Sequence, residues 1–109
     1  MSRDDSSRIA DILAAIEKCE KYAQQFTNAS SIELKSMVED AIERNLLIIG
    51  EAVTHLSPEF IEAHPDIAWS QIRGLRNILV HEYFGVDMAT IRDVVTNYLP
   101  PLAEYLRNL

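Results

Sequence analysis

Cysteine, glycine and proline are all scarce in this chain. Its 109 residues include one cysteine, three glycines and four prolines. The single cysteine, Cys19, cannot close an internal disulfide, and it excludes a zinc site built from several thiolates. Because turn-forming residues are few, we expect few and long secondary-structure elements, which favours helices over a sandwich of short strands.

Long apolar runs and an excess of positive charge are also missing. The longest strongly apolar run, residues 46–50, is far too short to cross a bilayer. Residues 1–5 are polar and lack the apolar core of a signal sequence, so we expect a cytosolic protein with no membrane partner. A net charge of −7 disfavours non-specific binding of nucleic acid, which depends on basic surface. Any nucleic-acid site must therefore be a local basic pocket.

The remaining composition is that of an ordinary globular domain. Hydrophobic residues make up 48% of the chain and charged residues 25%, so we expect residues 1–109 to form one domain. Apolar residues recur at steps of three and four, as in amphipathic helices. They predict an all-α, up-and-down bundle of four to five helices, at about 7–26, 31–56, 58–63, 67–83 and from 88 onward.

Local signals mark where these helices begin and end. Ser6 or Ser7 can cap the first helix, and Ser57 followed by Pro58 predicts the start of a short one. That short helix should end before Pro65, after which Asp66 can cap the next helix. At the other end of the chain, Asp87 can cap the last helix, which should kink or restart near Leu99 because Pro100 and Pro101 lack backbone donors.

Several residues in the middle of the predicted helices have two interpretations each. Asn45 falls near the centre of an apolar face, either as a buried amide bonded inside the bundle or as an active-site or interface group. Leu46, Leu47 and Gly50 fall on a second side of the same helix, which could contact the core or a partner chain. Gly74 costs about 1 kcal/mol in a helix relative to alanine, which suggests close helix packing or close approach of a ligand.

The segment from Arg73 to His81 gathers four polar side chains that suit phosphate chemistry. Arg73 and Arg76 offer planar donor forks for phosphate oxygens. His81 can take and give a proton near neutral pH. Asn77 lies four residues before His81 on one helix face, where it could orient the imidazole or a phosphate oxygen.

Arg76 and His81 are separated by about 140° around an ideal helix, so they do not meet easily within one chain. Either the helix ends near His81 and redirects it, or two chains bring their copies together. A two-fold dimer would place two copies of each side chain around one cleft.

Other catalytic arrangements do not fit the sequence. His55, His64 and His81 lack a metal-ligand spacing, and no glycine-rich phosphate loop is present, so we predict neither a metal nor a cofactor. His55 and His64 are predicted to be surface residues near helix ends. Cys19 lies beside Glu17 and Glu20, which would not lower the pKa of its thiol. Taken alone, the Arg76–His81 spacing is common by chance, and a solvent-facing helix remains the alternative.

The longer pattern of residues 72–87, Ile-Arg-Gly-Leu-Arg-Asn-Ile-Leu-Val-His-Glu-Tyr-Phe-Gly-Val-Asp, resembles the signature of HEPN proteins. More narrowly, it resembles the HepT toxins, which are often encoded beside a minimal nucleotidyltransferase (MNT). Trp69 before the signature and residues 98–102 after it are also similar to that branch. The resemblance extends from about Ile9 to Leu106.

This resemblance implies a dimeric helical bundle with metal-independent RNase activity. The family's arginine, following polar residue and histidine fall on Arg76, Asn77 and His81. In that chemistry the RNA 2′-hydroxyl attacks the adjacent phosphate and leaves a cyclic phosphate. His81 would act as general base or acid, Arg76 would stabilise the transition-state charge, and Asn77 would orient His81 or the phosphate.

The resemblance also implies a site of regulation. The family's tyrosine two residues after the histidine falls on Tyr83, to which the nucleotidyltransferase antitoxin attaches AMP. By helical geometry, however, Tyr83 lies about 200° from His81, so a core tyrosine with its hydroxyl at the rim is the alternative.

Three functions are therefore compared. The first is an RNase toxin of a HEPN/MNT pair, homodimeric and neutralised by its nucleotidyltransferase partner. The second is a non-catalytic helical subunit that binds a nucleotide or docks onto the nucleotidyltransferase. The third is a structural bundle with no site. Loss of RNA cleavage in a folded His81→Ala variant would separate the first from the second.

Overall fold

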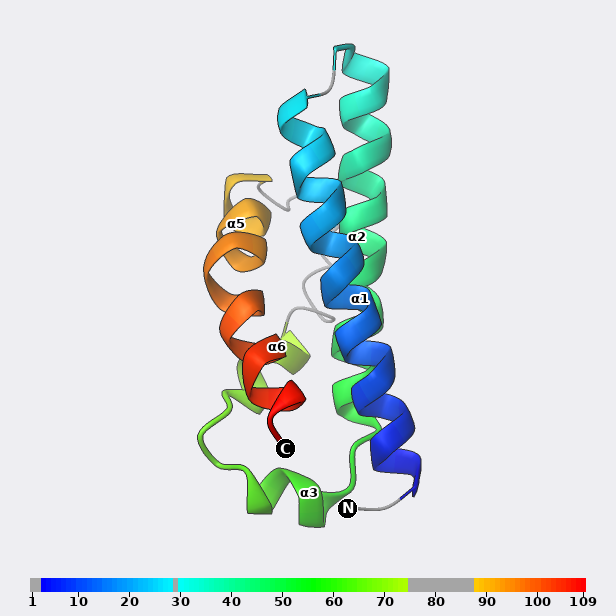
Figure 1. The fold of residues 1–109 in the computed structure, drawn as a ribbon. Helices are drawn as coiled ribbons and strands as arrows, with labels where there is room; N and C mark the ends of the chain where they lie inside the picture. The colour runs from blue at the N-terminus through cyan, green and yellow to red at the C-terminus, as the bar shows by residue number, and fades with distance from the viewer. Residues whose placement is uncertain (1–2, 29, 75–87) are drawn as a thin grey trace.

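The computed structural model of the chain describes residues 3–28, 30–74 and 88–109, and these residues form helices and short connections without a strand. Figure 1 shows the order of the elements. They are α1 (Arg3–Asn28), α2 (Ile32–Thr54), α3 (Pro58–Ala63), a helical stretch at 69–74, α5 (Met88–Asp93), the π-helix η2 (Val94–Tyr98) and α6 (Leu99–Arg107). The prediction of an all-α bundle is confirmed.

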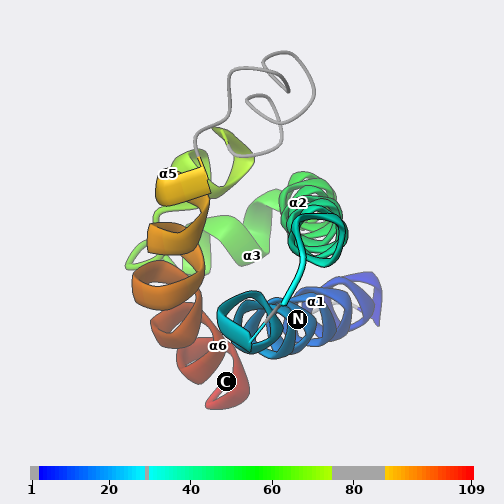
Figure 2. The ribbon, with the colours of Figure 1, turned by 90° about the horizontal axis from the view of Figure 1, so that it is seen from above.

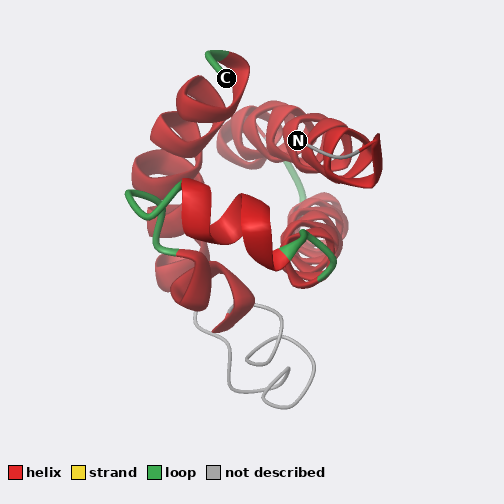
Figure 3. Cartoon of the chain, turned by 90° about the horizontal axis from the view of Figure 1, so that it is seen from below, coloured by secondary structure: helices red, strands yellow, loops and turns green. Residues whose placement is uncertain are grey.

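Two long helices and one composite column make up the bundle. Helices α1 and α2 form an antiparallel pair, and α1 also packs against η2 and α6 (Figure 1). Seen from above, α5, η2 and α6 form one continuous column beside this pair (Figure 2). The short α3 crosses the end of the bundle between that column and α2 (Figure 3). Helix α3 thereby closes the end at which the chain turns toward residues 69–74.

One apolar core joins all of these helices. Its fully buried side chains include Ile12 and Ile16 of α1 and Leu46, Ile49 and Val53 of α2, at the predicted helical spacing. Phe60 of α3 and Trp69 close one end of the core, and the α5–α6 column adds buried aliphatic side chains. Burial of these apolar surfaces is the main stabilising contribution to the fold.

Cys19 is part of this core. Its side chain is fully buried, and the thiol donates a weak hydrogen bond to the Ile42 carbonyl, with a sulfur–oxygen distance of 3.9 Å. Burial, together with the neighbouring Glu20 carboxylate, raises the pKa of the thiol to about 12. Since the thiolate is the reactive form, Cys19 is a packing residue, and its pKa is not lowered, as its acidic neighbours in the sequence predicted.

The observed helix starts agree with the predicted positions in two cases. Ser31 caps α2 by accepting a hydrogen bond from the Leu34 amide at 3.1 Å, and Ser57 caps α3 in the same way through the Phe60 amide. The prediction for α1 was wrong, because the helix begins at Arg3 and includes Ser6 and Ser7. The reason is that Asp5, in its first turn, is anchored by the rest of the fold, as described below.

The second side of α2 is also buried inside a single chain. Leu46 has no exposed surface and Gly50 is buried, whereas Leu47 is half-buried. Of these three residues, therefore, only Leu47 keeps surface for a partner. Asn45 is the buried amide of the first interpretation, since it is 6% exposed and its Nδ2 donates to the Ala41 carbonyl at 2.8 Å.

The last part of the chain restarts at Leu99, as the two following prolines predict. In η2 the Leu99 amide donates to the Val94 carbonyl, five residues back, so this turn holds one residue more than an α-turn. Across this wider turn, the buried residues follow one another at intervals of four positions: Ile91, Val95 and Leu99. Tyr98, one residue before the last of these positions, points outward and is 60% exposed.

Candidate functional site

The helical stretch 69–74 leads into the signature segment. Arg73, the first predicted phosphate ligand, is exposed on this stretch, whereas Trp69 one turn earlier is buried. Arg76, Asn77, His81 and Tyr83 lie outside the described residues, as does the predicted cap Asp87. The structure therefore describes the contacts that position residues 69–74, where the signature begins.

Trp69 fixes the start of this stretch. Its indole Nε1–H donates to the His64 carbonyl at 2.9 Å, and its ring meets Phe60 edge-on with centroids 5.9 Å apart. The helical stretch begins at Trp69, and the Ile72 amide donates to the Ala68 carbonyl at 3.2 Å. The helix thus starts later than the predicted cap Asp66, because the buried indole sets its register.

His64 belongs to the same anchor. Its Nδ1 lies 3.0 Å from the Tyr105 hydroxyl of α6, and its ring packs on Phe60 with centroids 4.5 Å apart. His64 is half-buried at the end of α3, so it lies near a helix end as predicted, but its ring is packed against neighbouring side chains. Although helix α3 ends beside it, as the following proline requires, aromatic packing holds the imidazole against α6.

A buried carboxyl group secures the other end of α3. Asp5 is 2% exposed, and its Oδ1 accepts from the Ser57 amide at 2.8 Å while its Oδ2 accepts from the Ser57 hydroxyl at 2.7 Å. The Ser57 Oγ in turn accepts from the Phe60 amide at 3.1 Å. This relay connects the first turn of α1 to α3. Through Phe60 and Trp69 it also connects α1 to the helical stretch 69–74.

The role of Asp5 is not visible in the sequence. An acidic residue in a first helical turn is already explained by the helix dipole, so nothing in the sequence distinguishes Asp5 from the exposed Asp4 beside it. The partner, Ser57, is 52 residues away. Only the packing of α3 across the end of the bundle brings the two together.

Gly74 is the last described residue of the signature before residues 75–87. A Cβ at Gly74 would meet no described atom within 4 Å, so packing of the described helices does not require glycine here. We predict that Gly74→Ala raises the free energy of unfolding by about 1 kcal/mol through helix propensity, measured by urea denaturation. A loss of RNA binding in this more stable variant would indicate close approach by ligand. Destabilisation would contradict the open environment.

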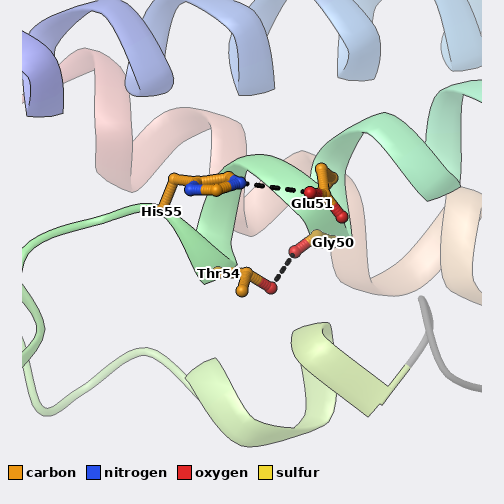
Figure 4. Close-up of polar contacts among 4 residues, drawn as sticks. All are labelled: Gly50, Glu51, Thr54 and His55. Carbon is orange, nitrogen blue, oxygen red and sulfur yellow. Dashed lines mark hydrogen bonds and ion pairs between the residues drawn. The ribbon is translucent and has the colours of Figure 1, made fainter.

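His55 provides a useful contrast with the signature histidine. It is exposed at the end of α2, as predicted, and its Nε2 lies 3.1 Å from Glu51 Oε1 (Figure 4). The hydroxyl of the preceding residue, Thr54, donates to the Gly50 carbonyl at 2.9 Å (Figure 4). These are contacts within one helix end. Within the described ranges, no three His, Cys, Asp or Glu residues gather in a group that could hold a metal ion.

The described part of the chain also contains no helix that combines the length and apolar character needed to span a bilayer.

The described residues form a small helical bundle, and the Arg76-Asn77-x3-His81 pattern follows the anchored Trp69 in the sequence. Residues 12–109 match the family described as "Ribonuclease HepT-like". The chain belongs to the HepT-like ribonuclease family.

Individual relatives carry the same description. A protein of Caldanaerobacter subterraneus named "Putative RNase" is 33% identical over 99 residues, which cover 86% of each chain. The "Probable ribonuclease HepT" of Thermococcus cleftensis is 32% identical over 94% of this chain and 92% of its own. A Methanocaldococcus jannaschii protein named "Gamma-glutamylcyclotransferase and putative RNase" is 36% identical over 95% of this chain. The present chain covers only 46% of that longer relative. No solved structure matches.

Proposed function

We propose that this chain is a metal-independent RNase toxin that cuts RNA at a composite site of a homodimer and is neutralised by a nucleotidyltransferase antitoxin. The observation that carries the proposal is the match to the ribonuclease family over residues 12–109, which contain the complete Arg76, Asn77 and His81 signature. His81 moves the proton of the attacking 2′-hydroxyl or of the leaving oxygen. Arg76 stabilises the charge that builds up on the phosphate.

The arrangement of the described residues supports this assignment of roles. Trp69 is held by a hydrogen bond and by aromatic packing, so the helix that carries Arg73 starts from a fixed point. Preorganised donors contribute most to catalysis when their supporting elements are rigid. Because Arg73 is exposed on this helix, it is available to bind a phosphate of the RNA.

The test is cleavage of a mixed RNA pool by purified protein in EDTA. The proposal expects cleavage in the chelator and products that end in a cyclic phosphate. Sedimentation should give twice the chain mass of 12.4 kDa if the site is composite. An active protein that sediments as a monomer would overturn the dimeric site while leaving the RNase activity in place.

Tyr83 is the proposed site of neutralisation. We predict that the wild-type chain incorporates labelled AMP when it is incubated with ATP and a minimal nucleotidyltransferase from the same genome, and that RNA cleavage then falls at least tenfold. Bulk and negative charge at the cleft would exclude the RNA backbone. Tyr83→Phe should incorporate no label and should remain active.

Tyr98→Phe is the matched control for Tyr83, because Tyr98 is 60% exposed in the structure. It should incorporate AMP as the wild type does. Label that disappears in Tyr98→Phe but persists in Tyr83→Phe would contradict the assignment.

The net charge of −7 favours a second candidate, the non-catalytic subunit that binds a nucleotide or docks onto the nucleotidyltransferase. In that case Arg76 and His81 would hold a nucleotide phosphate without cutting RNA. The second candidate takes the lead if the wild-type protein does not cleave RNA but binds ATP or the nucleotidyltransferase, and if Arg76→Ala weakens that binding.

A further inference from the structure

An open groove of about 660 Å³ lies between the chain at residues 66–72 and the η2–α6 column. Its apolar lining includes Ile67 and Ile72 on one wall and Val94, Leu99 and Leu102 on the other. Arg73, the one described residue assigned to the RNA chemistry, does not line this groove.

The column wall of the groove is long and straight enough to take a helix. Val94, Tyr98, Leu102 and Tyr105 line it at steps of three and four, and the helix rises by about 17 Å from the first of them to the last. Three turns of a partner helix cover about the same length. Helix-in-groove recognition uses apolar anchors at this spacing, one on each turn.

Tyr98 stands out on this wall. It is 60% exposed, because the wide turn of η2 rotates it away from the core. An exposed aromatic ring above an apolar floor is typical of an interface anchor, since it adds apolar contact area at a low cost in conformational entropy.

The charges at the rim indicate the kind of partner. The charged residues that line the groove are Asp66 and Asp93, both exposed, and no basic side chain lines it within the described residues. Asp93 Oδ1 accepts from Asn97 Nδ2 at 2.6 Å. The guanidinium of the adjacent Arg92 packs 3.8 Å above the Phe26 ring, in a separate hollow. The rim is therefore negative.

We propose that this groove docks a helix of another protein whose aliphatic anchors are flanked by lysine or arginine. An RNA strand is disfavoured because both rim charges repel phosphate. An amphipathic basic helix satisfies both the apolar floor and the acidic rim.

The test uses a synthetic amphipathic peptide of about 15 residues, long enough for four turns, with leucine on one face and lysine on the other. Binding to the full chain is measured by fluorescence anisotropy at low ionic strength. Tyr98→Ser should raise the dissociation constant about tenfold through the loss of an anchor. The double variant Asp66→Asn/Asp93→Asn should raise it about fivefold and weaken its dependence on salt.

Matched control variants distinguish binding of the peptide in the groove from a general attraction of the basic peptide to an acidic protein. Met37→Ser removes a side chain that is 67% exposed on α2, and Asp11→Asn/Glu33→Gln removes two charges far from the groove in the sequence. Both should bind the peptide within twofold of wild type. All of these side chains are exposed, so circular dichroism should show unchanged folding in every variant.

Three results would overturn the proposal. The first is equal loss of binding in the groove variants and in their controls. The second is equal binding of a peptide in which glutamate replaces lysine. The third is a fall in the sedimenting mass of the protein when Tyr98 is changed, because the groove would then join two copies of this chain. RNA cleavage in EDTA should stay unchanged in the groove variants, so failure here is distinguishable from failure of the RNase proposal.

Discussion

The His81→Ala variant is expected to lose RNA cleavage by about 100-fold or more while its helical content and stability remain those of the wild type. A positioned general acid or base contributes this much or more to a proton-transfer step. Alanine offers neither a proton nor an acceptor, so only binding and the charge of the arginines remain. The measurement is the initial rate of cleavage of the RNA pool in EDTA, beside a thermal melt of each protein.

Two control variants make this result specific. His55→Ala removes an imidazole that is exposed at the end of α2, and it should cut RNA at the wild-type rate. Arg76→Ala should lose about 100-fold through the missing transition-state charge, whereas Arg107→Ala, in the last turn of α6, should lose nothing. Equal activity of the two histidine variants would remove His81 from the mechanism and would point to a contaminating nuclease.

The second large effect is expected for Asp5→Ala, which should lower the free energy of unfolding by about 3 kcal/mol. The substitution removes two hydrogen bonds to a carboxyl group and leaves the Ser57 amide without its acceptor. In a domain of this size such a change lowers the melting temperature by on the order of 10 °C. Urea denaturation followed by circular dichroism measures it.

Asp4→Ala is the matched control for Asp5, because both residues lie in the first turn of α1 and only Asp5 is buried. Both variants lose the same favourable interaction with the helix dipole, so their difference isolates the link to α3. Ser57→Ala combined with Asp5→Ala should cost less than the sum of the two single changes. Equal destabilisation by the two aspartate variants would show that the bonds to Ser57 contribute nothing.

The link to Asp5 also connects stability to the functional segment. Asp5 accepts hydrogen bonds from Ser57, and Ser57 caps α3. Phe60 of α3 packs on the ring of Trp69, the residue at which the helical stretch 69–74 begins. Loss of the Asp5–Ser57 contact should therefore weaken the packing of Phe60 on Trp69. For this reason, the activity of Asp5→Ala should be measured well below the melting temperature of the variant.

The sequence alone determined the fold class and most helix positions, because these depend on local chemistry. The apolar spacing of Ile12, Ile16, Ile49 and Val53 predicts the observed core, and Ser31, Ser57 and Pro58 mark two observed helix starts. The restart at Leu99 follows from the missing donors of the two prolines after it. The signature of residues 72–87 likewise identified the family, which the match over residues 12–109 confirms.

The tertiary structure alone decided which polar groups meet. Asp5 and Ser57 lie 52 residues apart, and His64 and Tyr105 lie 41 apart, so no periodic pattern joins them. The exposure of Tyr98 accompanies the hydrogen bond of the Leu99 amide to the Val94 carbonyl, a π-turn that helical spacing in the sequence does not distinguish from an α-turn. Long-range contacts of this kind form because burying one apolar core brings distant helix ends together, and the buried polar groups must then find partners there.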